Sequence, residues 1–76
     1  MSQHNTRLAR RLARMAFNLE WAKGAASAAH GWVLNGEQDS PEFGFCFREA
    51  LNGARVAVRE GEAIERALHP ERKAGA

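Results

Sequence analysis

The stretch LNGEQDSP, residues 34–41, decides the fold, because it separates two long segments that both have helical spacing. Asn35-Gly36 is a helix stop signal, since glycine accepts the left-handed backbone conformation that follows a helix C-terminus. Ser40 followed by Pro41 is a start signal, since serine caps free amide groups and proline is tolerated at the first helical position. A connector this short makes the chain fold back on itself, so the sequence predicts an antiparallel helical hairpin.

Apolar residues on either side of the connector recur at alternating steps of three and four, which is a heptad spacing. Before the connector they are Leu8, Leu12, Met15, Leu19, Ala22, Ala26, Ala29 and Val33. After it they are Phe43, Phe47, Ala50, Ala54, Ala57, Gly61, Ile64 and Leu68. We therefore predict an all-α chain with helices over about 6–34 and 41–69, a loop over 35–40, and a flexible tail over 70–76.

The two seams are expected to pack against each other as in a coiled coil. An antiparallel register places Leu12 opposite Ile64 and Met15 opposite Gly61. The second of these layers matches a large side chain with a small one, which is how a close-packed core fills its volume.

A chain of 76 residues forms one small domain, and domains of this size are marginally stable without a staple or a partner. Its single cysteine, Cys46, excludes an intramolecular disulfide. We therefore expect a homodimer in which two hairpins form a four-helix bundle. A lone cysteine fits a reducing compartment, and neither a membrane span nor a signal peptide is visible, so we expect a cytoplasmic protein without a membrane partner.

Several large apolar side chains fall outside the predicted seam. They are Phe17, Trp21, Trp32, Phe45, Leu51 and Val58. Exposed aromatic side chains usually mark an interface, and tryptophan dominates interface energetics. These residues are the predicted partner-binding set, with Trp21 and Trp32 as anchors. Homodimerisation and binding of a different protein would both bury such surface.

Four arginines share one face of the first predicted helix. They are Arg7, Arg10, Arg11 and Arg14, spaced three and four apart. A basic face of this kind binds nucleic-acid phosphates in many proteins. The alternative is a solvated face that pairs with Glu60, Glu62 and Glu65 on the second helix. The net charge of only +2 favours the pairing, and both interpretations stay open at this point.

No combination of residues in the sequence predicts catalysis. The histidines His4, His30 and His69 are far apart, and none stands at ligand spacing from Cys46, so no metal site or cofactor is expected. Small alanine- and arginine-rich helical chains without catalytic residues are common among phage accessory proteins. By that analogy of style, we expect a non-enzymatic regulatory or inhibitory protein that blocks a host protein, with nucleic-acid binding as the alternative.

Overall fold

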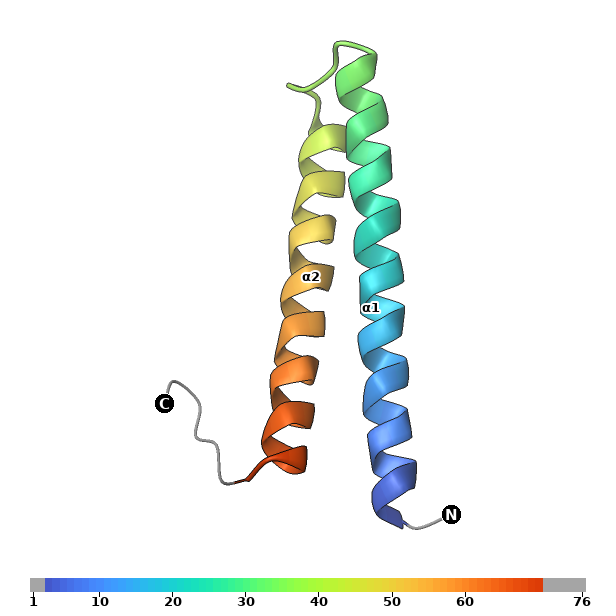
Figure 1. Ribbon diagram of the computed structural model, residues 1–76. Coiled ribbons are helices and arrows are strands. Elements are labelled where there is room, and N and C mark those ends of the chain that lie inside the picture. The colour runs from blue at the N-terminus through green and yellow to red at the C-terminus, as the bar shows by residue number, and fades with distance from the viewer. Residues whose placement is uncertain (1–2, 71–76) are drawn as a thin grey trace.

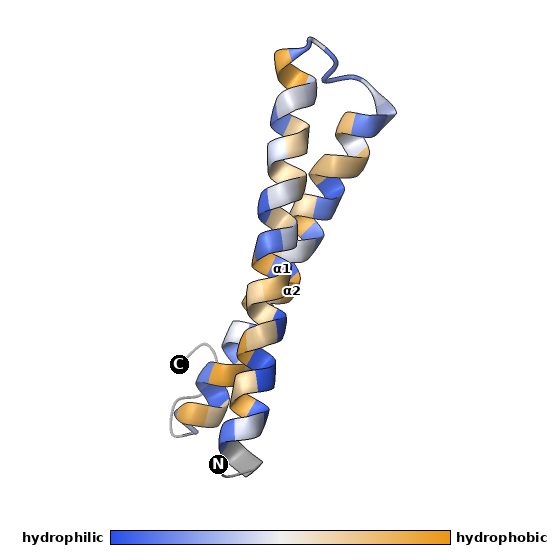
Figure 2. Ribbon diagram, turned by 90° about the vertical axis from the view of Figure 1, so that its right-hand side faces the viewer, coloured by the Kyte–Doolittle hydropathy of each residue, from blue (hydrophilic) through white to orange (hydrophobic). Residues whose placement is uncertain are grey.

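The chain forms two long helices that run antiparallel and lie side by side (Figure 1). The computed structural model describes the backbone of residues 3–70 and the side chains of residues 5–70. Helix α1 spans Gln3–Leu34 and helix α2 spans Pro41–Leu68. The prediction of an all-α hairpin is confirmed. Figures 1 and 2 together show that the helices cross at a shallow angle, with the connector at one end and an open end at the other.

Helix α1 begins at Gln3, three residues before the expected start, and continues through Gly31 to Leu34. Two backbone hydrogen bonds then close the helix. The amide of Gly36 donates to the carbonyl oxygen of Val33 at 2.9 Å, and the amide of Glu37 donates to that of Trp32 at 2.8 Å. This pair of bonds is a Schellman motif, and it needs a left-handed residue, which Gly36 supplies with φ of 75°.

Helix α2 begins where the start signal predicts. The backbone of Ser40 is extended, and its Oγ accepts a hydrogen bond from the amide of Phe43 at 3.1 Å. The same hydroxyl donates to the carbonyl oxygen of Glu37 at 2.8 Å, which ties the connector to the helix start. Pro41 occupies the first turn, and Glu42 places a negative charge at the positive end of the helix dipole.

Small residues set the spacing between the helices. A Cβ atom at Gly53 would lie 3.0 Å from the backbone oxygen of Asn18 and 3.2 Å from Cβ of Ala22, so the two backbones are in near contact there. A Cβ atom at Gly61 would lie 3.3 Å from Cε of Met15. The predicted Met15–Gly61 layer is therefore present, and glycine is the residue that permits it.

On α1 the buried stripe differs from the predicted seam at every second position, whereas on α2 it differs only at Phe47 and Leu68, which are exposed. On α1 the partly or fully buried positions with heptad spacing are Leu8, Arg11, Met15, Asn18, Ala22, Ala25, Ala29 and Trp32. On α2 they are Phe43, Cys46, Ala50, Gly53, Ala57, Glu60 and Ile64. The prediction was wrong for five large side chains, which are 45–49% exposed: Leu12, Leu19, Val33, Phe47 and Leu68.

On α1 this difference amounts to a rotation of the helix about its own axis, so that one residue per heptad stays at the interface and the other moves to the neighbouring flank. On α2 the predicted residues Ala54 and Gly61 stay partly buried. The rotation brings Gly53 against the α1 backbone and lets polar pairs close the interface. Nε1 of Trp21 donates to Oε1 of Glu49 at 3.2 Å, and Nη2 of Arg14 lies 3.5 Å from Oε1 of Glu60.

The resulting core is thin. Among the described residues, the buried hydrophobic side chains are Ala29, Ala57 and Ile64, whereas twelve larger ones are more than a third exposed. Hydrophobic and hydrophilic residues accordingly alternate along the visible sides of both helices (Figure 2). In the part of the chain that the structure describes, neither helix has a stretch long and apolar enough to cross a bilayer.

Candidate binding surfaces

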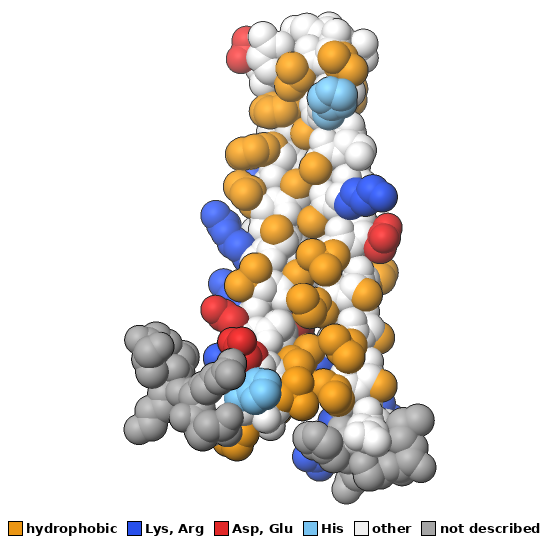
Figure 3. Space-filling model, viewed as in Figure 1, with side chains coloured by type: hydrophobic (Ala, Val, Ile, Leu, Met, Phe, Trp, Pro, Cys, Tyr) orange, Lys and Arg blue, Asp and Glu red, His pale blue; other side chains and the backbone are white. Residues whose placement is uncertain are grey.

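One face of the hairpin is apolar along its length, and we call it the open face. On α1 it consists of Leu12, Leu19, Ala26 and Val33, which are seven residues apart and all exposed. Phe47 holds the equivalent flank of α2 and stacks on Phe43, with ring centroids 5.8 Å apart. Figure 3 shows this face, with hydrophobic side chains along the groove between the helices and charged ones toward its edges.

The open face and the buried stripe together are wider than one helix can cover. A helix that contacts a single partner needs a narrow seam, whereas a helix inside a bundle needs an apolar stripe of 100° or more. On α1 the apolar positions extend from Met15 and Ala22, at the interface, to Leu12 and Leu19 beside it. The hairpin therefore carries a second apolar layer that α1 and α2 do not bury against each other.

The opposite face carries an aromatic cluster, which we call the tryptophan surface: Phe17, Trp21 and Phe45. Phe17 and Trp21 stack with ring centroids 6.5 Å apart, and Trp21 is 51% exposed. The hydrogen bond to Glu49 fixes the orientation of the indole. Trp21 and Phe45 also line one shallow depression of about 350 Å³, together with Gly24 and Cys46.

The other predicted partner-binding residues lie apart from this surface. Trp32 is partly buried at a heptad position of the helix interface. Leu51 and Val58 line a separate depression on α2, together with Ala54. The structure thus brings together Phe17, Trp21 and Phe45 on one surface and Leu51 and Val58 on another, with Trp32 apart from both.

The arginine cluster, Arg7, Arg10, Arg11 and Arg14, lines one shallow groove on the surface of α1. Its expected pairing with α2 occurs once among the described residues, between Arg14 and Glu60. At 3.5 Å, with 60% of the arginine side chain exposed, this ion pair contributes less than about 1 kcal/mol. Glu62 and Glu65 form no ion pair with the cluster in the described part of the chain, so the predicted pairing is largely absent.

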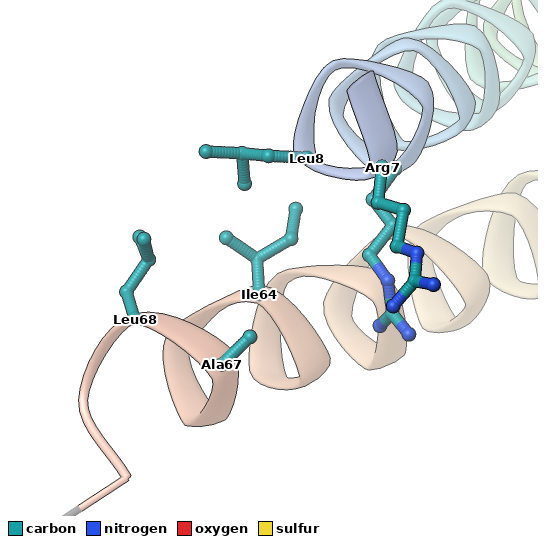
Figure 4. A pocket seen from close by; sticks show the side chains of 6 residues that line it. Arg7, Leu8, Ile64, Ala67 and Leu68 are labelled. Carbon is teal, nitrogen blue, oxygen red and sulfur yellow. The ribbon is translucent and has the colours of Figure 1, made fainter. Parts of the chain in front are cut away.

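A small cavity of about 140 Å³ lies beside the cluster at the open end of the hairpin. Figure 4 shows Leu8 of α1 and Ile64 and Leu68 of α2 around one space, with Arg7 on the other side of Ile64. Ala67 and the partly buried Arg11 complete the lining. The cavity therefore combines an aliphatic wall with two guanidinium groups.

The described residues offer little for metal or nucleophilic chemistry. No three His, Cys, Asp or Glu side chains among them converge at distances that suit a metal ion. Cys46 is a free, partly buried thiol at the tryptophan surface. His30 is exposed on α1, and the side chain of His4 lies outside the described residues.

Two features of these surfaces were missing from the sequence interpretation. The first is the open face, which the heptad pattern assigned to the helix interface. The second is Glu49, which accepts the hydrogen bond from Trp21. The sequence pattern around Glu49 gives no sign of this contact. A usable signal was the width of the α1 stripe, since more apolar positions were available than one partner helix needs.

Comparisons of this chain with models of protein families, with curated proteins and with solved structures give no match.

Proposed function

We propose that this chain is a non-enzymatic regulatory or inhibitory protein that acts by binding another protein. Two copies pair through the open face into a four-helix bundle, and the tryptophan surface on the opposite side engages the partner. The observation that supports this proposal is the imbalance of burial: three hydrophobic side chains are buried in the described chain, against twelve large exposed ones. A domain of this size needs additional burial to be stable.

The chemistry of the two faces supports self-association through the open face and partner binding through the tryptophan surface. The open face is aliphatic and repeats every seven residues, as self-packing helices require. The tryptophan surface contains a stacked aromatic pair, and a carboxylate holds one indole in place. An oriented tryptophan loses little conformational freedom on binding, which makes it a good anchor for a protein partner.

Capture of protein partners by the tagged chain tests the partner-binding part of the proposal. Trp21→Ala should abolish retention of the partner while helix content and solution mass stay as in the wild type. Leu34→Ala is the matched control, because it also truncates a well-exposed apolar side chain, and Leu34 belongs to none of the candidate binding surfaces. Equal capture by the wild type and Trp21→Ala would contradict the proposal.

Nucleic-acid binding is the second candidate, supported by the lack of carboxylate partners for Arg7, Arg10 and Arg11 among the described residues. If the cluster binds phosphates, affinity for an oligonucleotide should fall steeply with salt, and Arg10→Glu with Arg14→Glu should abolish it. A weak affinity that does not depend on these two arginines would exclude this candidate.

A further inference from the structure

The arginine cluster is electrostatically unfavourable in the described chain. Arg7 with Arg11, and Arg10 with Arg14, stand four residues apart on α1, and each like-charge pair of this kind costs a helix about 0.2–0.5 kcal/mol. Glu60 neutralises one member of the four. A negatively charged ligand would therefore relieve repulsion that the described residues leave in place.

The cavity at the open end adds an apolar requirement to this charge. Leu8, Ile64 and Leu68 form its aliphatic wall, and Arg7 and Arg11 also line it. In Figure 4, Arg7 lies on the other side of Ile64 from Leu8 and Leu68. Arg11 is partly buried, so an ion pair there is screened less by water than one on a fully exposed side chain. A ligand that fits both the arginines and the aliphatic wall therefore carries a negative charge and, close to it, an aliphatic group.

We infer that this cavity binds an acidic segment of the protein partner. A carboxylate of the segment pairs with Arg7 and Arg11, and a neighbouring leucine-like side chain enters the space between Leu8 and Leu68. Guanidinium groups bind carboxylates through two parallel hydrogen bonds, which fixes the orientation of the segment. This inference rests on the proposed protein-binding function, and it names the chemistry of the partner at a place separate from the tryptophan surface.

Nucleic acid fits the same residues less well. A phosphate backbone would use all four arginines alike and would leave the aliphatic wall without a role. Arg10 belongs to the cluster but does not line the cavity. The two ligands are therefore distinguished by comparing Arg10 with Arg11.

The test is a titration of the isotope-labelled full chain with short peptides, followed by the amide resonances of the protein. The probe is acetyl-Leu-Glu-Glu-Leu-amide. Two reference peptides each remove one requirement: acetyl-Leu-Gln-Gln-Leu-amide lacks the charge, and acetyl-Gly-Glu-Glu-Gly-amide lacks the aliphatic group. We expect saturable shifts at Leu8, Ile64 and Ala67 with the probe, and an affinity about tenfold lower for each reference peptide.

The matched variants are Arg7→Gln with Arg11→Gln, against Arg10→Gln with Arg14→Gln, which removes the same number of charges outside the cavity. The first pair should lower the affinity for the probe about tenfold, and the second should leave it within about twofold. Circular dichroism and solution mass of all variants report whether the fold and the assembly are intact.

Three results would overturn the inference. They are no saturable shift with the probe, equal binding of the peptide without leucines, and equal losses in the two pairs of variants. Stronger binding of a single-stranded oligonucleotide with equal losses in both pairs would assign the cluster to phosphates instead. Peptide binding at the cavity and partner capture through Trp21 are separate measurements. Either result can therefore be negative while the other is positive, which distinguishes failure of the inference from failure of the proposed function.

Discussion

Single residues determine how closely the two helices approach each other. Gly53 is the clearest case, because the backbone of Asn18 and the side chain of Ala22 occupy the space that a side chain would need. Gly24 is also inside a helix, yet a Cβ atom there would meet nothing within 4 Å. Both glycines reduce helix propensity, by about 1 kcal/mol relative to alanine, but the position of Gly53 compensates through packing.

Gly53→Leu should therefore lower the free energy of unfolding by about 1–3 kcal/mol, because a leucine overpacks the closest contact between the helices. The matched control is Gly24→Leu, which should raise it by about 0.5–1 kcal/mol, since leucine is a better helix former and its Cβ atom would meet nothing within 4 Å. Urea denaturation followed by circular dichroism measures both. Equal effects at the two positions would contradict the observed packing of α1 against α2.

The bounds of the two elements follow from signals close to the helix ends. Ser40 caps α2 through the Phe43 amide, Pro41 follows it, and Gly36 supplies the left-handed residue after α1. Such caps use only neighbouring residues, so the sequence predicts them well. The start of α1 carries no comparably strong signal, and the helix begins at Gln3 instead of near residue 6.

The cap of α2 can be tested alone. Ser40→Ala should lower the free energy of unfolding by about 0.5–2 kcal/mol, because the Phe43 amide loses its acceptor at a helix start. Ser40→Asp should restore most of this loss, since aspartate also caps. Thermal and urea unfolding measure the effect, and Ser27→Ala, an exposed serine inside α1, controls for loss of a hydroxyl. An Ala variant as stable as the wild type would show that the connector does not depend on this bond.

The face that each helix buries was less predictable than its length. A heptad pattern defines two flanks, and the one at Leu12 and Leu19 is more apolar than the one at Arg11 and Asn18. The pattern alone therefore predicts that the flank with Leu12 and Leu19 is buried. In the structure the flank with Arg11 and Asn18 is the partly buried one instead, because the close approach at Gly53 depends on the shape of both backbones together. For the same reason the sequence identified the exposed tryptophan surface around Trp21 but not its bond to Glu49.

The whole molecule is a hairpin that leaves most of its large apolar side chains in water. Its open face and its tryptophan surface lie on opposite flanks, and the arginine cluster continues the tryptophan side of α1, since Arg10 and Arg14 stand one heptad before Phe17 and Trp21. Of these surfaces, the open face suits a second copy of the chain best. In a symmetric dimer the open faces of the two copies would meet, and each would present the same heptad repeat to the other. We therefore propose a functional form that contains two hairpins.

The most direct measurement is the solution mass by light scattering, for the wild type and for Leu19→Asp. We expect the wild type to have twice the 8.4 kDa mass of the chain. Leu19 is 48% exposed in the single hairpin, so an aspartate there is tolerated in the monomer but is buried and unpaired in the bundle. The variant should accordingly show the mass of one chain. A wild type of 8.4 kDa that stays helical, or a Leu19→Asp variant that keeps the doubled mass, would contradict this account.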